Sequence, residues 1–379
     1  MSSPFREGVK DMRVIISGGG TGGHIFPAIA IANALKKIDE KTEILFVGAE
    51  GRMEMEKVPA AGYKIEGLWI SGLQRRLTID NLSFPFKVIS SLMKSKKIIR
   101  SFRPDVAVGT GGFASGPLLR TASGMNIPCL IQEQNSFPGI TNKLLGSRVN
   151  KICVAYEGME KYFPKEKIVV TGNPVRQDIL SLDGKREEAF KSFSLNSKKK
   201  TVLFLGGSLG ARTINYSVAD CMNLLIKNHI QIIWQTGKSY VPFATEATTQ
   251  LPGEDNGVRV FGFLSRMDLA YAAADIVVSR AGAISLSEVA IVKKPCILVP
   301  SPNVAEDHQT KNAMALVKKD SAILVKDSEA REKLGNEIIS LMSDAHKQNK
   351  LSENISKLAF LNSADVIAKE VIKLVQNRK

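Results

Sequence analysis

The stretch Val14–Leu35, VIISGGGTGGHIFPAIAIANAL, begins as a short apolar run, turns through glycines and continues with apolar residues at helical spacing. Ile25, Ile29, Ala32 and Leu35 fall on one face of the expected helix. A strand that ends in glycines and opens a helix is typical of doubly wound α/β folds.

The same pattern restarts in the second half of the chain, at residues 201–212 (TVLFLGGSLGAR). Other short apolar strands are expected at 44–48, 106–109, 129–131, 151–154, 168–170, 231–234, 258–261, 276–278 and 296–299. Continuous apolar strands that alternate with helical stretches indicate parallel sheets covered on both faces. The fold class is therefore α/β, with two doubly wound, Rossmann-like domains.

The domain break is expected near Gly172-Asn173-Pro174, ahead of a polar segment. This gives an N-terminal domain at 1–172 and a C-terminal domain at 173–350. The remaining helices, within 351–379, are expected to pack back on the N-terminal domain.

Composition narrows the class of protein. The four cysteines form no CxxC pair, which argues against a disulfide framework and a zinc site and fits a reducing cytoplasm. Residues 1–12 lack the apolar core of a signal peptide, and no segment has the length and apolarity of a membrane span. The net charge of +15 calls for an acidic partner: nucleic acid, anionic lipid or a phosphorylated substrate.

Three glycine turns follow expected strands, at Gly18–Gly23, Gly111–Gly116 and Gly206–Gly210. Glycine lets the backbone approach an anion, and the helix behind it offers unpaired N–H groups and partial positive charge. A single turn of this kind is about as often only a tight connection between strand and helix as it is a phosphate site. Three of them at the carboxyl ends of strands indicate a ligand site.

Other phosphate-binding classes fit less well. The first turn matches the dinucleotide pattern GxGxxG, but the second strand is expected to end at Gly48, with Glu50 further along. A dehydrogenase is therefore not favoured. The chain carries neither a Walker A string nor a DxD string, so no metal site is expected.

A further polar cluster lies in the second half. Ser287 and Glu288 are expected in the first turn of a helix, where Glu288 either complements the helix dipole or grips both hydroxyls of a ribose. Gln309, near the start of the next helix, is either a solvated residue or a partner for sugar hydroxyls.

Together these residues resemble the MurG family, which adds N-acetylglucosamine (GlcNAc) to the undecaprenyl-linked muramyl-pentapeptide precursor of peptidoglycan. The matching strings are GGGTGGHIFPAIAIANAL (18–35), GTGGFASGP (109–117), EQN (133–135), GNPVR (172–176), GGSLGAR (206–212), RAGAISLSE (280–288) and EDHQTKNA (306–313). They stand in the expected order over almost the whole chain. The family's architecture is GT-B, two Rossmann-like domains that face each other across a cleft.

The resemblance implies roles for individual residues. On the donor side, Ser208 and its glycine turn would hold the pyrophosphate, Arg176 would approach the phosphates or the uridine, and Leu264 would line the uracil pocket. Glu288 would bind the ribose, and Gln309, with His308, the GlcNAc hydroxyls. The nucleotide site would be lined by Ala283, Ile284, Ser285, Leu286 and Ser287, and the sugar and cleft would be faced by Thr21, Gly22, Gly23 and Asn135.

An inverting transfer needs a base for the acceptor hydroxyl and positive charge for the leaving pyrophosphate. His24 is the candidate base, against the alternative that it only hydrogen-bonds its loop; Glu133 is the backup. A helix N-terminus with an arginine can stabilise the leaving group, so no cofactor is expected.

A basic segment, Arg75–Arg103, carries eight Lys and Arg residues against Asp80 alone. Apolar residues lie among them, an arrangement that suits anionic lipid headgroups, although a solvated basic helix over the core explains it too. The expected membrane-binding residues are Leu82, Phe84, Phe86, Lys87, Lys94, Lys96 and Lys97. The expected location is peripheral, on the cytoplasmic face of the plasma membrane.

The expected partners are UDP-GlcNAc, the undecaprenyl-linked acceptor, an anionic membrane surface and other cell-wall synthesis enzymes. Nucleic acid is not expected, because no recognised binding module is present. Two alternatives stay open: a UDP-GlcNAc 2-epimerase, and a UDP-sugar-binding protein without catalysis.

Overall fold

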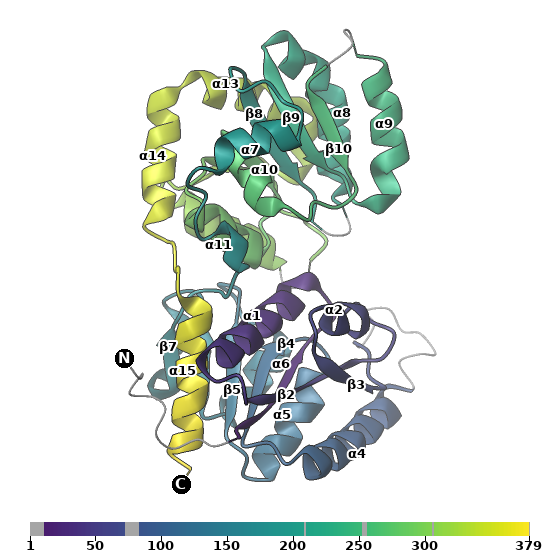
Figure 1. The fold of residues 1–379 in the computed structure, drawn as a ribbon, viewed down its shortest axis with the longest axis vertical. Coiled ribbons are helices and arrows are strands. Elements are labelled where there is room, and N and C mark those ends of the chain that lie inside the picture. Colours follow the sequence, from purple (N-terminus) through teal and green to yellow (C-terminus); the bar gives the residue numbers. More distant parts are fainter. Residues whose placement is uncertain (1–10, 73–82, 208–209, 252–255, 305–306, 379) are drawn as a thin grey trace. The chain divides into compact units, whose positions relative to one another are not determined.

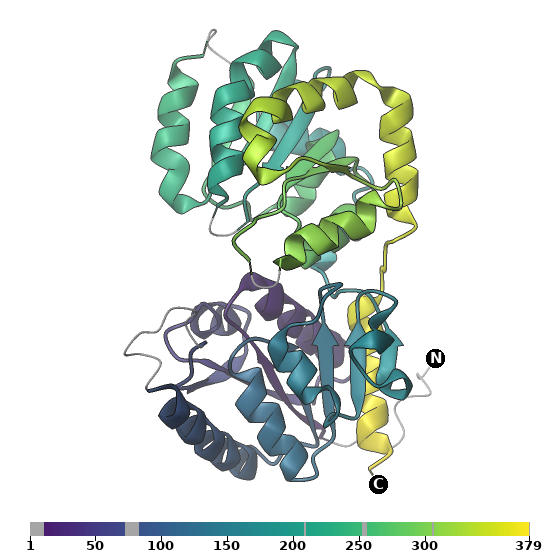
Figure 2. The same ribbon diagram turned by 180° about the vertical axis from the view of Figure 1, so that it is seen from behind.

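The computed structural model describes residues 11–72, 83–207, 210–251, 256–304 and 307–378, which form two compact units. Unit 1 comprises residues 1–175 and 362–379, and unit 2 comprises residues 176–361. Each unit is built on one parallel sheet with helices on both faces (Figures 1 and 2).

Unit 1 contains a seven-stranded sheet in the order β3-β2-β1-β4-β5-β6-β7, in which every pairing is parallel. The strands are β1 (Arg13–Gly18), β2 (Glu43–Ala49), β3 (Lys64–Leu68), β4 (Val106–Gly111), β5 (Cys129–Glu133), β6 (Lys151–Val154) and β7 (Ile168–Val170). The central strands β4 and β5 are buried along their whole length, as expected of a sheet covered on both faces.

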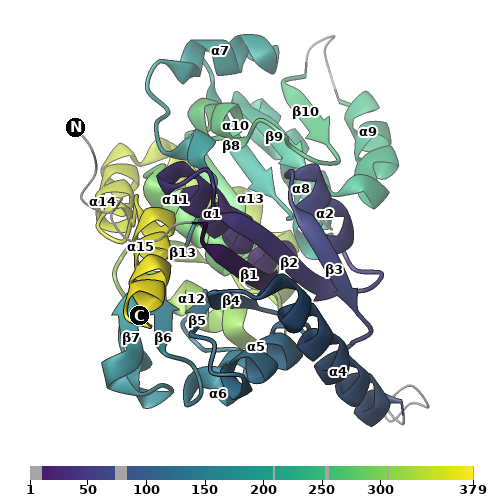
Figure 3. The same ribbon diagram turned by 60° about the horizontal axis from the view of Figure 1, so that its bottom comes forward.

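Two helical layers cover this sheet. One apolar cluster joins it to α1 (Gly22–Ile38), α2 (Glu54–Ala60) and α15 (Ser363–Gln376). The other joins it to α4 (Phe84–Phe102), α5 (Ser115–Gly124) and α6 (Ile140–Gly146). Figure 3 shows α4 and α5 on the face opposite to α1 and α15.

Unit 2 contains a six-stranded parallel sheet in the order β10-β9-β8-β11-β12-β13. Its strands are β8 (Lys200–Leu205), β9 (Ile230–Gln235), β10 (Val258–Phe261), β11 (Ile276–Ser279), β12 (Cys296–Leu298) and β13 (Ile323–Leu324). Its helices are α7 (Lys185–Ser192), α8 (Arg212–Lys227), α9 (Val241–Thr249), α10 (Met267–Ala273), α11 (Ala283–Ile291), α12 (His308–Val317), α13 (Ala330–Ser343) and α14 (Ala345–Ser356).

Both sheets reverse their strand order at one place, between β1 and β4 in unit 1 and between β8 and β11 in unit 2. In open α/β sheets, ligands bind beside the carboxyl ends of the strands at such a switch point. The three glycine turns that the sequence singles out follow β1, β4 and β8, and the turn after β11 leads to the helix that carries Glu288, so each unit has one candidate ligand edge.

Several details differ from the sequence-based expectations. Strands β3 and β13 were not expected, and the units divide at 175/176 rather than 172/173. The expected C-terminal segment 351–379 is split, because α14 belongs to unit 2 and α15 to unit 1. Within the described ranges, no helix is both long and apolar enough to span a bilayer.

Candidate active site

The two glycine turns of unit 1 lie in direct contact. The amide N–H of Gly19 donates to the backbone oxygen of Gly111 at 3.3 Å. A Cβ on Gly112, whose φ is +91°, would overlap the Gly19 backbone, and one on Gly18 would overlap the Thr110 hydroxyl. Both positions therefore require glycine, which brings the ends of β1 and β4 together at the switch point.

His24 lies in the first turn of α1 at this edge. Its Nδ1 lies 3.0 Å from Oε1 of Gln134, which follows β5. Gln134 Nε2 donates to the backbone oxygens of Thr110, at 2.7 Å, and of Gln132, at 3.1 Å. Since the amide nitrogen faces these carbonyl groups, the amide oxygen faces His24 and accepts a hydrogen bond from the Nδ1–H group. A neutral His24 then carries its free lone pair on Nε2.

Buried amides continue this network. Gln134 also donates to the Gln132 side chain, and Gln132 Nε2 donates to Asn173 Oδ1 at 2.9 Å. Asn173 Nδ2 donates to the backbone oxygen of Gln134 at 3.1 Å. These side chains are all buried, so their mutual bonds hold the loop after β5 in one arrangement.

Glu133, the backup base, is buried and fully engaged. Its Oε1 accepts from the backbone N–H of Asn135, at 2.9 Å, and from the Asn135 side chain, at 3.2 Å. Its Oε2 accepts from the Gly139 N–H, at 3.1 Å, and from Asn142 Nδ2, at 2.8 Å. Four donors around one carboxylate favour a structural role in holding the loop that carries Asn135.

Glu54, which sequence reasoning missed, supports the first glycine turn. Its buried carboxylate accepts from the Gly20 N–H at 2.9 Å and from the Ala49 N–H at 3.0 Å. The turn after β1 is thereby tied to the end of β2. Glu54 is the first residue of α2, a common place for a glutamate, so the sequence carries no signal for this role; the close contact with Gly19 and Gly48 appears only in the fold.

The other expected residues of this edge are accessible. Thr21 and Gly23 are exposed, and Gly22 and Asn135 are half-buried. A Cβ on Gly23 would meet only the Thr21 hydroxyl, at 3.6 Å. The N–H groups of His24 and Ile25 donate to the Thr21 oxygen at 3.1 Å. The donors that the start of α1 offers to an anion are therefore the N–H groups of Gly22 and Gly23.

In unit 2, the glycine turn after β8 is held from the neighbouring strand. Gln235, at the end of β9, donates through Nε2 to the Gly207 oxygen at 3.0 Å and accepts from the Leu264 N–H at 3.3 Å. Leu264 is buried beside this turn. A Cβ on Gly210, at φ +81°, would overlap the Thr236 backbone. Ser208, the expected pyrophosphate ligand, lies outside the described residues.

Glu288 is buried on α11 and bound at both oxygens. Oε1 accepts from Arg176 Nε at 2.9 Å, and Oε2 accepts from the Tyr271 hydroxyl at 3.0 Å. Burial raises the pKa of the Glu288 carboxyl, and Arg176 opposes this effect. Each oxygen has a second lone pair, so the carboxylate can accept two more hydrogen bonds.

One local expectation is wrong. Helix α11 begins at Ala283, with Gly282 in an extended conformation before it, so Ser287 and Glu288 lie in its second turn. Ala283 and Leu286 are buried, whereas Ile284, Ser285 and Ser287 are partly exposed. Helix-dipole stabilisation, which falls off beyond the first turn, therefore does not explain Glu288.

Arg280, between β11 and α11, joins three elements. Its Nη1 donates to the Val299 oxygen at 2.9 Å and forms an ion pair with Asp327. The other oxygen of Asp327 accepts from Thr213 Oγ1, at the start of α8, at 2.9 Å. These bonds hold together the segments that follow β8, β11, β12 and β13.

Gln309 and His308 open α12 and are half-buried. Gln309 Oε1 accepts from the Ser301 N–H at 2.8 Å, which fixes the loop after β12. This bond directs the side-chain oxygen of Gln309 toward the Ser301 backbone and leaves the side-chain nitrogen pointing away from Ser301.

The expected membrane segment forms α4, and its apolar surface differs in part from the prediction. Phe86, Ile89 and Met93 are 69 %, 57 % and 66 % exposed and follow helical spacing. Phe84 is half-buried, and Leu82 lies outside the described residues. Met93 was not among the expected residues.

The lysines of α4 are of two kinds. Lys94 pairs with Glu50 at 3.0 Å, and Lys87 donates to Ser71 Oγ at 3.2 Å. Lys96 and Lys97 are exposed, and they lie three and four residues after Met93, so they extend the exposed stripe of α4.

The position of Glu50 bears on the dinucleotide alternative. Strand β2 ends at Ala49, so Glu50 follows it directly, where a dinucleotide site would need an acidic residue. Its carboxylate is already paired with Lys94.

Two family models match the chain, one within unit 1 and one over most of unit 2 and the first part of α15. The glycosyltransferase family 28 N-terminal domain matches residues 14–154, and the family 28 C-terminal domain matches residues 201–371. A crystal structure of MurG from Acinetobacter baumannii superposes with a TM-score of 0.76 at 26 % identity, over 96 % of this chain and 99 % of that one. The fold is thus GT-B, and the class is glycosyltransferase.

Curated relatives define the family more closely. A protein of Flavobacterium psychrophilum is 56 % identical over 98 % of this chain and 100 % of its own length, and one of Bacteroides fragilis is 57 % identical over 98 % of both. Both are named UDP-N-acetylglucosamine–N-acetylmuramyl-(pentapeptide) pyrophosphoryl-undecaprenol N-acetylglucosamine transferase. This chain belongs to that family of transferases, the MurG family.

The open alternative of an epimerase has the same fold. A UDP-GlcNAc 2-epimerase from Neisseria meningitidis bound to UDP-GlcNAc superposes with a TM-score of 0.66 but only 14 % identity, over 96 % of this chain and 100 % of that one. That likeness shows the shared fold alone, so the family rests on the sequence matches.

Proposed function

We propose that this protein transfers GlcNAc from UDP-GlcNAc to the 4-hydroxyl of MurNAc in undecaprenyl-diphospho-MurNAc-pentapeptide, with inversion, and so converts lipid I to lipid II in peptidoglycan synthesis. The observation that carries the proposal is the full-length identity of 56–57 % to transferases of this name. The two glycine-lined switch points, one in each unit, support it.

In this proposal His24 is the general base. Its bond to Gln134 leaves Nε2 as the proton acceptor of the neutral ring, the state that a base for a sugar hydroxyl requires. The half-buried ring lies beside Thr21, Gly22 and Gly23, the proposed acceptor loop. Asn135 is proposed to face the same substrate, held in place by Glu133 rather than assisted by it in catalysis.

Unit 2 is proposed to bind the donor. Glu288, held by Arg176 and Tyr271, would accept hydrogen bonds from the two ribose hydroxyls. Leu264 would contact the uracil, and the partly exposed Ile284, Ser285 and Ser287 would line the nucleotide site. Ser208 and the Gly206–Gly210 turn would bind the pyrophosphate at the start of α8, and Gln309 with His308 the GlcNAc hydroxyls.

Unit 1 is proposed to bind the membrane through α4. Phe86, Ile89 and Met93 would enter the headgroup region, and Lys96 and Lys97 would contact anionic lipid. Under this proposal the enzyme would act at the cytoplasmic face of the plasma membrane, where its lipid acceptor and other cell-wall enzymes would meet it. The paired side chains of Lys87 and Lys94 would contribute less.

One assay separates the candidate functions. The pure protein is incubated with UDP-GlcNAc and a lipid I analogue, and UDP release is followed. We expect UDP only when the acceptor is present. An epimerase would turn over UDP-GlcNAc without acceptor, and a binding protein would show donor binding by calorimetry with neither turnover; either result would refute the transferase.

A further inference from the structure

A basic pocket lies in unit 1, at the edge of the sheet opposite to the glycine turns. It has a volume of about 640 Å³ and is lined by the end of α4, the start of β4, the turn after α5 and the end of α15. Asp105 directly precedes β4, whereas the glycine turn follows β4 at Gly111. A six-residue strand separates them by about 20 Å, so the pocket is distinct from the candidate active site.

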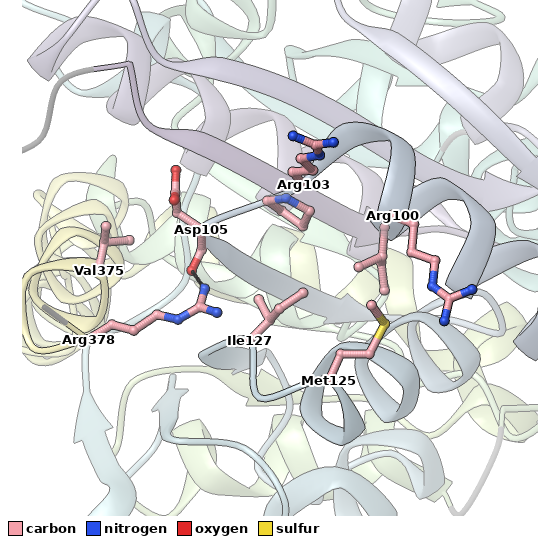
Figure 4. Close-up of a pocket in the computed structure, with 9 residues that line it drawn as sticks. Arg100, Arg103, Asp105, Met125, Ile127, Val375 and Arg378 are labelled. Carbon is pink, nitrogen blue, oxygen red and sulfur yellow. Dashed lines mark hydrogen bonds between the residues drawn. The ribbon is translucent and has the colours of Figure 1, made fainter.

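Three arginines line this pocket, and their guanidinium groups point in different directions at its rim (Figure 4). Arg100 and Arg103 come from the end of α4, and Arg378 enters from the side of α15. Ile127 and Met125 lie between Arg378 and Arg100 in this view. The arginine side chains are exposed, whereas Ile127 is buried, so a ligand would meet positive charge at the rim and hydrocarbon underneath.

The positive charge of the pocket is not neutralised by its own carboxylate. Asp105 is the one acidic residue among those that line it, and its Oδ2 accepts from the Arg13 N–H at 2.8 Å. Arg378 Nη1 donates to the backbone oxygen of Asp105 at 3.4 Å, not to the carboxylate. Over the described ranges, none of the three arginines forms an ion pair, and the pocket keeps a net positive charge.

Part of this charge complements the carboxyl ends of α4 and α15, where cations are favoured. That effect does not account for three guanidinium groups around one apolar hollow. Guanidinium groups match phosphate oxygens in geometry and charge. We propose that this pocket binds a phosphate ester, with the phosphate bound by arginine at the rim and the organic part on the apolar residues of the floor, Ile127 and Met125.

The ligand chemistry has two possible sources, a lipid headgroup and a free phosphate compound. The test therefore uses two probes, monomeric dihexanoyl phosphatidic acid and inorganic phosphate, each titrated into the full chain without substrates. Isoleucine δ1-methyl NMR reports the place of binding, since Ile99 and Ile127 line the pocket and Ile297 lies in the core of unit 2.

We expect saturable shifts at Ile99 and Ile127, none at Ile297, and affinity about tenfold lower for inorganic phosphate, which cannot use the floor. Equal affinity of the two probes, with the same shifts, would overturn the proposed phosphate ester, because the floor would then contribute nothing to binding. Shifts elsewhere, or none, would overturn the proposal.

Two triple variants, both designed to keep the native fold, test the role of the arginines. The variant R100Q/R103N/R378Q removes the three charges; asparagine is chosen because Arg103 has a φ of +52°, which asparagine tolerates. K198Q/K199Q/K227Q removes three exposed charges from unit 2. We expect about tenfold weaker binding in the first variant only. Equal binding by both variants would overturn the proposal, and transferase activity is not part of this readout.

Discussion

At the scale of single residues, the arrangement of His24 is the feature with the most chemical content. Its Nδ1 faces an amide oxygen whose orientation is set by two backbone carbonyl groups. The protein thereby selects one tautomer without placing a charged partner behind the ring. Gln134 is a positioning residue in this scheme, since it acts through His24.

Replacement of the proposed base tests this arrangement directly. His24→Ala should lower kcat about 10²- to 10⁴-fold, because proton removal from the acceptor hydroxyl loses its base. The affinity for UDP-GlcNAc should stay the same, since the proposed donor residues lie in unit 2. UDP release gives kcat and calorimetry gives the donor Kd. Full turnover in this variant would remove His24 from the mechanism.

Gln134→Leu is the companion variant. It leaves the imidazole in place but removes the acceptor at Nδ1, so we expect kcat to fall about tenfold, equivalent to about 1.4 kcal/mol in the barrier. Nitrogen NMR of the His24 ring distinguishes positioning from general damage. The native protein should show protonated Nδ1, and the variant a mixture of tautomers; unchanged ring signals would contradict the assignment.

For Glu288 we expect an effect on donor binding rather than on kcat. Glu288→Gln keeps the side-chain shape but replaces one acceptor oxygen by a donor, so UDP-GlcNAc binding should weaken about tenfold. Calorimetry with UDP-GlcNAc and with UDP measures the change. Tyr271→Phe is the control, because it removes a neighbour of Glu288 and leaves both carboxylate oxygens in place. Equal loss in both variants would point to packing rather than to ribose binding.

At the scale of elements, charged pairs connect helices that the sequence does not pair. Asp268, in α10, accepts from Arg266 Nε at 2.9 Å and from Lys185 Nζ, in α7, at 3.0 Å. Hydrogen bonds from these two cations hold the pKa of the Asp268 carboxyl well below its usual range. The contact between α7 and α10 therefore depends on an ionised carboxylate.

A pH dependence follows from this pair. A carboxyl group with a lowered folded-state pKa stabilises the fold above its ordinary pKa of about 3.9, and this contribution is lost as the pH falls. Asp268→Asn should lower the Tm of unit 2 by about 2–4 °C at pH 7. The difference from the native protein should shrink as the pH falls from about 5 toward 2. A difference that grows on acidification would contradict this account.

Helix α4 carries the membrane prediction. Reversing Lys94, Lys96 and Lys97 to Glu should abolish most sedimentation with anionic vesicles, since each basic side chain contributes about 1 kcal/mol near such a surface. Lys198, Lys199 and Lys227 reversed to Glu in unit 2 form the matched control. Sedimentation that is unchanged in the first variant would leave α4 as a solvated helix.

The sequence predicts elements well where burial is continuous and poorly where it is not. Strands such as β4 and β8 can be recognised in the sequence as apolar runs that lead into glycine. The two-residue β13 has no pattern to detect. The start of α11 was misplaced because Gly282 precedes Ala283 with no Ser, Thr, Asp or Asn side chain to mark the cap.

The candidate site follows the same division. Glycine turns and His24 are visible because backbone geometry and chemistry restrict the residue type. Gln134, Gln235 and Glu54 act through bonds to backbone groups from other strands. Their partners are set by sheet order, which periodicity alone does not provide, so the supporting residues emerge only from the fold.

At the scale of the whole molecule, unit 1 is discontinuous, because α15 completes the core that α1 and the sheet begin. Ile367, Val371, Ile372 and Val375 of this helix are buried. Burial of four such side chains stabilises unit 1 by about 6 kcal/mol or more.

Removal of the residues after Leu361 tests this dependence. The shortened chain should lose the calorimetric transition of unit 1 or show it at a much lower temperature, because an apolar face of the sheet layer is left uncovered. The transition of unit 2 should persist, since all of its strands and helices remain. Ile367→Ala is the milder variant, with an expected loss of about 2–5 kcal/mol. Retention of both transitions would contradict the role of α15.

The position of α15 at the end of the chain also affects the order in which the two units can fold during translation. All of unit 2 is synthesised between the two parts of unit 1, so unit 2 is the first to have every residue of its core available. The seven strands of unit 1 are synthesised early, but its core is incomplete until α15 has been synthesised. Until then the apolar surface beside α1 is exposed and can bind chaperones. Translation speed through unit 2 thus sets how long the nascent first unit stays unfinished.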